Sequence, residues 1–398
     1  MINPFSKASL RGALVALGVA ASLLLSSFAP AVSAVSGCSG DEPDGDGTSL
    51  CRFKSVGSLR VSKAAGLGRI EFHGKVGAVL QRDEGTVSLL DLSNPARPKK
   101  VGEYADDIED SFDGDLAFSD DGKWLFYARQ THQFSKDGIH VLNVSDPSAP
   151  ALMHYQPAGG AYRIAYQKDA AGEWVVLLDA THGLVVYRFE PTTGQLVPVF
   201  IDPLPALKVG GPASAGIYID REDPQLKVPL MYVTTGLTGL QVYDISDPTA
   251  PALVGEWSTV GLAEVEVSAT TRSRTVYAAT EYWFDPSIES EVVVLDASKL
   301  DAIKERRRLS AGAGTEESLR VQGMSLSGNR LLIAHSGMGM VSATAGRTFN
   351  GWAKIAGSRN EGAGVLGAPF AMDVEETRGH IYLTDAATGT LTVLRPAR

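Results

Sequence analysis

An internal repeat dominates the chain after residue 52 and limits the folds open to it. Each copy contains a turn, a strand of alternating apolar residues and often the ending Asp-x-Ser-Asn/Asp-Pro, as in GTVSLLDLSNP from Gly85 and GLQVYDISDP from Gly239. Successive copies lie 45 to 56 residues apart, which is typical of proteins that repeat one small supersecondary unit. The equivalent positions are Asp91, Asn143, Arg188, Asp244, Asp296, Thr344 and Arg395.

Each copy contains four short strands, which are clearest in the sequences GIYID, LMYVTT, GLQVYDIS and PALVGEW within residues 216–257. Gly, Pro, Asn and Asp turns separate them, and no amphipathic helix lies between them, so the sheets should be antiparallel. A four-stranded unit of about 40 to 50 residues is a β-propeller blade. The sequence therefore predicts an all-β fold, a seven-bladed β-propeller over residues 52–398.

The two ends of the repeat region complement each other. The last copy stops after its third strand, LTVLRPAR, whereas residues 54–61, KSVGSLRV, match fourth strands such as KVGEY at residues 100–104. We expect the N-terminal strand to complete the C-terminal blade, because this would close the ring and remove an exposed sheet edge that invites aggregation.

The first 34 residues have the features of a signal peptide. Lys7 and Arg11 precede an apolar stretch at residues 13–25, and small residues follow at 31–34. The apolar stretch is too short for a transmembrane helix. We therefore expect an exported protein that is periplasmic, secreted or on the outer surface of a bacterium.

Residues 35–51 form an acidic, Gly- and Pro-containing segment that we expect to be flexible. It contains Cys38 and Cys51, for which two interpretations stay open. The sequence VSGC ending at Cys38 resembles a bacterial lipobox, in which the cysteine is acylated; alternatively, Cys38 and Cys51 form a disulfide after cleavage at residue 34. Membrane contact is expected only through a lipid at Cys38.

Charge argues against a nucleic-acid partner. The chain has 46 acidic and 36 basic residues and a formal net charge of −10, and its one dense basic run is Arg306–Arg308. The 44% hydrophobic content is enough for a large core and excludes wholesale disorder.

The repeat endings DLSNPARPKKVGEY, NVSDPSAPALMHY and DISDPTAPALVGEW closely resemble those of LVIVD-repeat proteins. This resemblance implies an exported, often surface-associated bacterial propeller, and the family mostly lacks an assigned activity. From the residues alone, the Asp and Ser of each ending should hydrogen-bond the backbone where the strand stops.

Loops between the second and third strands carry most of the candidate catalytic residues. His132, His182 and His335 occupy equivalent loops, with Arg129 beside the first, and imidazoles around one opening would bind a transition metal or transfer protons. The alternative is that they are solvated loop residues. Weaker candidate metal ligands are the carboxylates Asp179, Glu281 and Asp385. We expect no resident cofactor, with a divalent metal as the less favoured alternative.

The innermost strands and one loop supply candidate ligand-binding residues. The first strands of the blades can be aligned on a shared apolar position, which is Met372 in the last blade. The residues just before this position in four other blades are Arg69, Asp115, Arg163 and Glu264, and Ala371 is the equivalent in the last blade. Such charges would orient a carboxylated or sugar ligand, or else pair with one another. Tyr282 and Trp283 would contact a sugar or partner protein, or plug the structure as a buried loop.

No linear catalytic motif such as GxSxG or HExxH is present. The favoured function is therefore a binding or scaffold module at the cell envelope that holds an envelope protein or a small acidic or saccharide ligand. The alternative is an enzyme, a lyase or hydrolase of an acidic saccharide or a lactonase, with its site in the propeller funnel.

Overall fold

The computed structural model of the chain describes residues 53–63, 66–82, 84–106, 111–131, 136–204, 215–281, 290–310, 321–328, 330–335, 339–344, 353–354 and 371–396. These residues all belong to one compact unit within residues 33–398. The expected signal peptide and the segment with Cys38 and Cys51 lie outside the described residues. Within the described part of the chain, no helix has the length and apolar character needed to span a membrane.

The described residues of this unit form seven four-stranded antiparallel sheets. They are β2 (Leu67–His73), β3 (Val76–Gln81), β4 (Thr86–Asp91) and β5 (Lys99–Tyr104) in blade 1; β6 (Ser111–Phe118), β7 (Trp124–Thr131), β8 (Gly138–Asn143) and β9 (Ala151–Pro157) in blade 2; β10 (Ala161–Lys168), β11 (Glu173–Asp179), β12 (Gly183–Glu190) and β13 (Gln195–Asp202) in blade 3; β14 (Ala215–Asp220), β15 (Leu230–Thr235), β16 (Gly239–Asp244) and β17 (Ala252–Trp257) in blade 4; β18 (Leu262–Ala269), β19 (Arg274–Thr280), β20 (Glu291–Asp296) and β21 (Lys304–Ser310) in blade 5; β22 (Val321–Ser327), β23 (Arg330–His335), β24 (Gly339–Thr344) and β25 (Ala353–Lys354) in blade 6; and β26 (Ala371–Thr377), β27 (His380–Asp385), β28 (Thr390–Pro396) and β1 (Phe53–Arg60) in blade 7.

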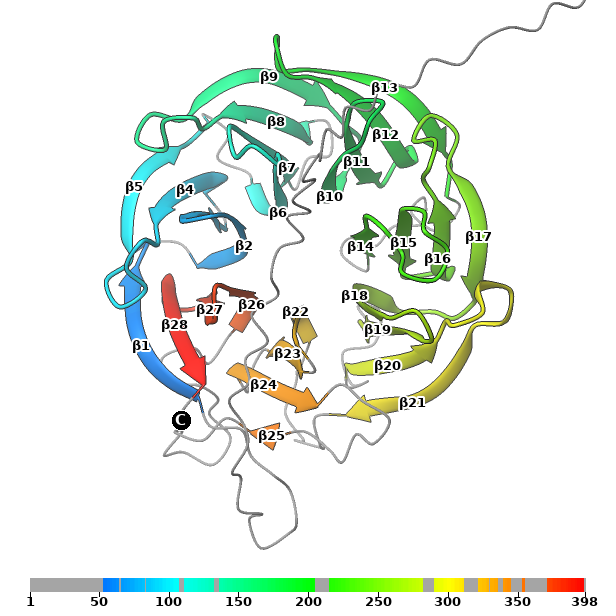
Figure 1. The fold of residues 1–398 in the computed structure, drawn as a ribbon. Helices are drawn as coiled ribbons and strands as arrows, with labels where there is room; N and C mark the ends of the chain where they lie inside the picture. The colour runs from blue at the N-terminus through cyan, green and yellow to red at the C-terminus, as the bar shows by residue number, and fades with distance from the viewer. Residues whose placement is uncertain are drawn as a thin grey trace, which may run out of the picture. The chain divides into compact units, whose positions relative to one another are not determined.

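The blades are arranged in a ring around a central axis (Figure 1). The first strand of each blade is innermost and contacts the first strand of the next, in the order β2, β6, β10, β14, β18, β22 and β26. Strand β26 in turn contacts β2, which closes the circle. The prediction of an all-β, seven-bladed propeller is confirmed.

The ring is closed by pairing the N-terminal strand with the C-terminal one. Strand β1 lies antiparallel to β28, with Phe53 opposite Pro396 and Arg60 opposite Thr390, and the blue and red strands lie together in Figure 1. Blade 7 thus takes strands from both ends of the repeat region, as the sequence predicted.

Apolar side chains fill the space between neighbouring sheets. Between blades 2 and 3, the rings of Phe126 and Phe189 meet edge to face with centroids 4.8 Å apart, and Trp124 packs on Phe189. Aromatic residues suit these gaps because one side chain covers a large apolar area.

The repeat endings of blades 1 and 2 each contact a neighbouring blade. In blade 1, Asp91 Oδ1 accepts the Ser93 N–H at 2.9 Å and Asn94 Oδ1 accepts the Ala96 N–H at 3.1 Å, which makes two successive Asx turns. The corresponding turn of blade 2 presents the Pro147 carbonyl oxygen to Gly102 of β5, so closely that a methyl group on Gly102 would overlap it. The endings therefore have the structural role expected from their residues, and they also lock adjacent blades together.

Candidate functional site

A β-bulge near the start of the innermost strand recurs in six of the seven described blades, and β14 is the exception. In blade 3 the register shifts between Ala161 and Arg163 against β11. A bulge bends its strand and re-aims the next side chain, so it sets the direction of the charged residues that follow.

Five charged residues occupy equivalent positions at or just after these bulges and surround the axis. Each precedes an apolar residue at a fixed register: Ile70 lies opposite Val79, and Val374 lies opposite Leu383. The blade 7 equivalent is therefore Asp373, and the sequence alignment that chose Ala371 and Met372 was wrong by two residues. Its cause is the register of the β26–β27 hairpin, which an apolar pattern alone does not fix. We call this set the axial ring: Arg69, Asp115, Arg163, Glu264 and Asp373.

Ion pairs cross the axis within the ring. Arg69 of blade 1 and Arg163 of blade 3 both pair with Glu264 of blade 5, and the Arg163 Nη2–Glu264 Oε1 distance is 2.7 Å. Arg69 Nη1 also lies 3.5 Å from Asp373 Oδ1. The two pairs with Glu264 join blades that are not adjacent, whereas the Arg69–Asp373 pair joins the neighbouring blades 1 and 7, so all three contacts link distant parts of the sequence. The mutual pairing considered for this set is present.

Two ring carboxylates also hold the next blade. Asp115 Oδ2 accepts the Ile164 N–H at 3.0 Å, and Asp373 Oδ2 accepts the Ile70 N–H at 3.0 Å. Burial raises the pKa of Asp115 to about 6, although Arg163 and Arg69 oppose the rise. Burial would raise the pKa of Glu264 too, but Arg69 and Arg163 hold it below the ordinary value of 4.5.

A second layer of three glutamates lies two residues beyond the ring, where side chains return to the same face of the strand. Glu71, Glu266 and Glu375 come from β2, β18 and β26, and the Ser325 hydroxyl donates to Glu375 Oε2 at 3.2 Å. Burial and the neighbouring Asp115 and Asp373 raise the pKa of Glu71 to about 8. The sequence pattern did not lead us to predict this layer. The one signal for it in the sequence is an acidic residue two positions after the ring residue in three blades.

A different set of polar residues lies at or near the ends of the second strands, and these residues are buried. Asp179 accepts the Thr181 and His182 N–H groups at 2.7 and 2.9 Å, and Asp385 accepts the Ala387 and Thr388 N–H groups at 2.8 and 2.7 Å. Both therefore shape their own loops. The full set is Gln81, Arg129, Asp179, Thr235, Thr280, His335 and Asp385.

Arg129 belongs to a buried cluster between blades 1 and 2. It pairs with Asp106, which also lies 3.6 Å from His140 Nε2, and the Tyr104 hydroxyl hydrogen-bonds His140 Nδ1 at 2.7 Å. Burial and the nearby Arg129 charge lower the pKa of His140 to about 3, so this imidazole is neutral at physiological pH.

The predicted histidines differ in their surroundings. His335 is fully buried at the end of β23, whereas the His182 side chain is 53% exposed and its Nδ1 lies 3.1 Å from Asp179 Oδ2. Glu281 is partly buried and its N–H donates to Gly261 O. His132, Tyr282 and Trp283 lie outside the described residues. Among the residues that the structure describes, no group of three His, Cys, Asp or Glu is arranged to hold a metal ion.

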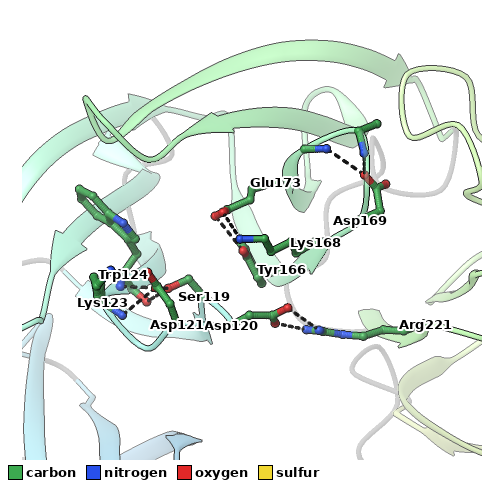
Figure 2. Close-up of polar contacts among 12 residues, drawn as sticks. Ser119, Asp120, Asp121, Lys123, Trp124, Tyr166, Lys168, Asp169, Glu173 and Arg221 are labelled. Atoms are coloured by element: carbon green, nitrogen blue, oxygen red, sulfur yellow. Dashed lines mark hydrogen bonds and ion pairs between the residues drawn. The ribbon is translucent and has the colours of Figure 1, made fainter. Parts of the chain in front are cut away.

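The turns between first and second strands, at the other end of the blades, carry ion pairs of their own (Figure 2). Asp120 of blade 2 pairs with Arg221 of blade 4 through two contacts of 2.7 and 2.8 Å. Blade 3 contributes Glu173, which accepts from Tyr166 Oη at 2.8 Å and pairs with Lys168 Nζ at 2.7 Å. These contacts brace the turns.

A family model for the LVIVD repeat matches residues 231–259, which run from β15 past the end of β17. The chain is a β-propeller that carries an LVIVD repeat. No curated protein sequence matches this LVIVD-repeat propeller.

Solved structures share the fold of the LVIVD-repeat propeller at low sequence identity. Raptor of Chaetomium thermophilum is 11% identical with a TM-score of 0.60, and the match covers 88% of this chain and 30% of Raptor. Sqt1 of Saccharomyces cerevisiae is 9% identical with a TM-score of 0.54, covering 87% and 99% of the two chains. Hydrazine synthase of Kuenenia stuttgartiensis is 14% identical with a TM-score of 0.57, covering 85% and 98%. These likenesses concern the fold alone.

Proposed function

We propose that this LVIVD-repeat propeller is exported to the bacterial envelope and acts there as a binding or scaffold module whose ligand or partner contacts the axial ring. The leader-like residues 1–34 and the repeat support the location. The observation that carries the binding role is the meeting of Arg69, Arg163 and Glu264 from three separate blades.

The charges of the axis distinguish two classes of ligand. A carboxylated sugar would have to replace Glu264 on the two guanidinium groups, because Arg69 and Arg163 already bind that carboxylate. A basic side chain of a partner protein would instead meet Glu266 and Glu375, whose interacting charged neighbours are carboxylates. We therefore favour an envelope protein that presents a basic group over an acidic saccharide.

Calorimetric titration of the full chain with a tetralysine peptide and, separately, an oligogalacturonate tests the proposal, at pH 9 because the raised pKa values leave the second-layer glutamates less ionised at lower pH. We expect saturable binding of the peptide, weakened at least about tenfold by Glu266→Gln. Glu256→Gln on the exposed outer strand β17 is the matched control and should bind like the wild type. No binding of either probe, or equal binding by both variants, contradicts a binding site at the axis; saccharide binding alone would reverse the choice of ligand.

One observation favours an enzyme as the second candidate. The His182 Nδ1 lies 3.1 Å from Asp179 Oδ2 and the histidine side chain is 53% exposed, so a buried carboxylate orients an imidazole that a substrate can reach. Such a histidine serves as general base in hydrolysis or elimination. Assaying the chain on lactones and uronic-acid oligosaccharides, with His182→Gln as the variant, tests this role; turnover that is unchanged in the variant rules out His182.

A further inference from the structure

The innermost strands bring acidic groups together in excess of basic ones. The axial ring and the second layer contain six carboxylates and two guanidinium groups, so the set would carry 2 − 6 = −4 if every group were ionised. We call these eight residues the axial cluster: Arg69, Glu71, Asp115, Arg163, Glu264, Glu266, Asp373 and Glu375.

Both guanidinium groups of the cluster form their ion pairs with carboxylates of the axial ring. Arg163 pairs with Glu264, and Arg69 pairs with Glu264 and Asp373, all in the axial ring. The second layer has acidic surroundings, since Glu71 interacts with Asp115 and Asp373, while Glu266 interacts with Glu264 and Asp373.

The third glutamate of the second layer also has acidic neighbours. Glu375 interacts with Asp373, Glu71 and Glu266. The groups that face the layer from the remaining strands are the Ser325 hydroxyl of β22, which donates to Glu375, and Tyr218 of β14 beside Glu266. Strands β6 and β10 contribute Asp115 and Arg163 of the ring.

Carboxylates gathered on contacting inner strands repel one another where they are sheltered from water, and uptake of a proton removes the repulsion. We propose that the axial cluster is a proton-binding site, and that release of its protons loosens the ring where β18, β22, β26 and β2 meet. This seam includes blade 7, which closes the propeller. The inference does not rest on the proposed function, because it concerns the propeller without a ligand.

The direction of the effect follows from the pKa of each glutamate. Burial raises the pKa of Glu71 from 4.5 to about 8, and burial with neighbouring carboxylates raises those of Glu266 and Glu375 well above 4.5. The folded chain therefore binds more protons than the unfolded chain between about pH 4.5 and pH 8. Stability from this source is present at the acidic end of that window and is lost as pH rises through it.

Thermal unfolding of the full chain between pH 6 and pH 9 tests the proposal. We expect the melting temperature of the wild type to fall by roughly 5 °C over this range and that of Glu71→Gln/Glu266→Gln/Glu375→Gln to stay nearly constant, because glutamine mimics the protonated acid. Glu256→Gln on β17 should fall like the wild type. A constant wild-type value, or an equal fall in the triple variant, overturns the proposal.

Direct titration of the wild type covers the case in which the triple variant does not fold. Carbon-13 resonances of the glutamate carboxyls, assigned with the single variants, should include midpoints above pH 6. Midpoints that all lie near 4.5 overturn the proposal whatever the variants do. Because no ligand is present, these results are independent of whether the tetralysine peptide binds.

Discussion

At the end of β11 a single carboxylate fixes the conformation of two loops. Asp179 is fully buried, and its oxygens accept the N–H groups of Thr181, His182 and Gly159. Gly159 lies just before β10, so the carboxylate ties the loop after β11 to the connection that enters the blade. Hydrogen bonds to a charged group contribute more to stability than neutral ones, so this carboxylate stabilises the fold as well as orienting His182.

Asp179→Ala should lower the free energy of unfolding by about 2 to 3 kcal/mol, because it removes three backbone hydrogen bonds to a buried carboxylate. Asp179→Asn retains one oxygen acceptor and should lose less. Urea unfolding measures both. Asp301→Ala on the exposed η3 turn (Leu300–Ala302) is the control, expected within about 0.5 kcal/mol of the wild type. Equal losses in Asp179→Ala and the control would contradict the role assigned to this residue.

Gly102→Ala should destabilise the propeller by about 1 to 3 kcal/mol, because the added methyl group meets the backbone of Pro147 in the next blade. The matched control is Gly172→Ala, whose methyl group would lie 3.5 Å from the Trp174 ring in ordinary contact. Thermal or urea unfolding compares the two. A Gly102→Ala variant as stable as the wild type would show that the backbone at Pro147 shifts at little cost in free energy.

The sequence predicted which polar residues lie near the strand ends, but not whether they are buried or which residues contact them. His335 and Arg129 occupy positions where a loop histidine or arginine would be exposed, yet both are fully buried. Their burial depends on neighbouring blades, such as the Asp106 partner of Arg129 in the connection that follows β5. Contacts between sheets are set by packing, which a single sequence does not reveal.

Among the elements, the strands and their turns were the most predictable parts. Short alternating segments between Gly, Pro, Asn and Asp turns gave the number of blades, and the unmatched residues 54–61 gave the closing strand β1. The register at the axis was harder to predict. In β26 the choice of Met372 over Val374 moved the ring position by two residues, because apolar residues at both places satisfy the same alternation.

Removal of β1 should open the ring. A chain that begins at residue 62 leaves β28 with a free edge, so we expect a lower melting temperature and concentration-dependent association. A chain that begins at residue 52 keeps all of β1 and is the control. Light scattering during size exclusion, together with thermal unfolding, measures both properties. A monomer as stable as the control would show that closure does not depend on this strand.

Across the whole molecule, each inner strand contacts the next and the last contacts the first. No blade therefore has a free side along the circle, and partial unfolding would expose apolar surface on both neighbouring sheets. This continuity favours a single cooperative transition over blade-by-blade melting.

We expect denaturant unfolding followed by tryptophan fluorescence and by far-ultraviolet circular dichroism to give coincident curves. Three of the five tryptophans, Trp124, Trp174 and Trp257, lie in blades 2 to 4, whereas the dichroism reports on every strand. Because the ring is continuous, both signals should change at one midpoint. Separate midpoints would mean that part of the ring unfolds first.

The pairing of β1 with β28 also determines when the native fold first becomes accessible during protein synthesis. The partners Phe53 and Pro396 are separated by 396 − 53 = 343 residues, which a ribosome adds in roughly 20 to 70 s. Throughout that time the earliest strand of the propeller has no native neighbour in its own blade. A chain that stays unfolded until β28 has been synthesised therefore loses no time in forming the β1–β28 pair, because this pair cannot form earlier.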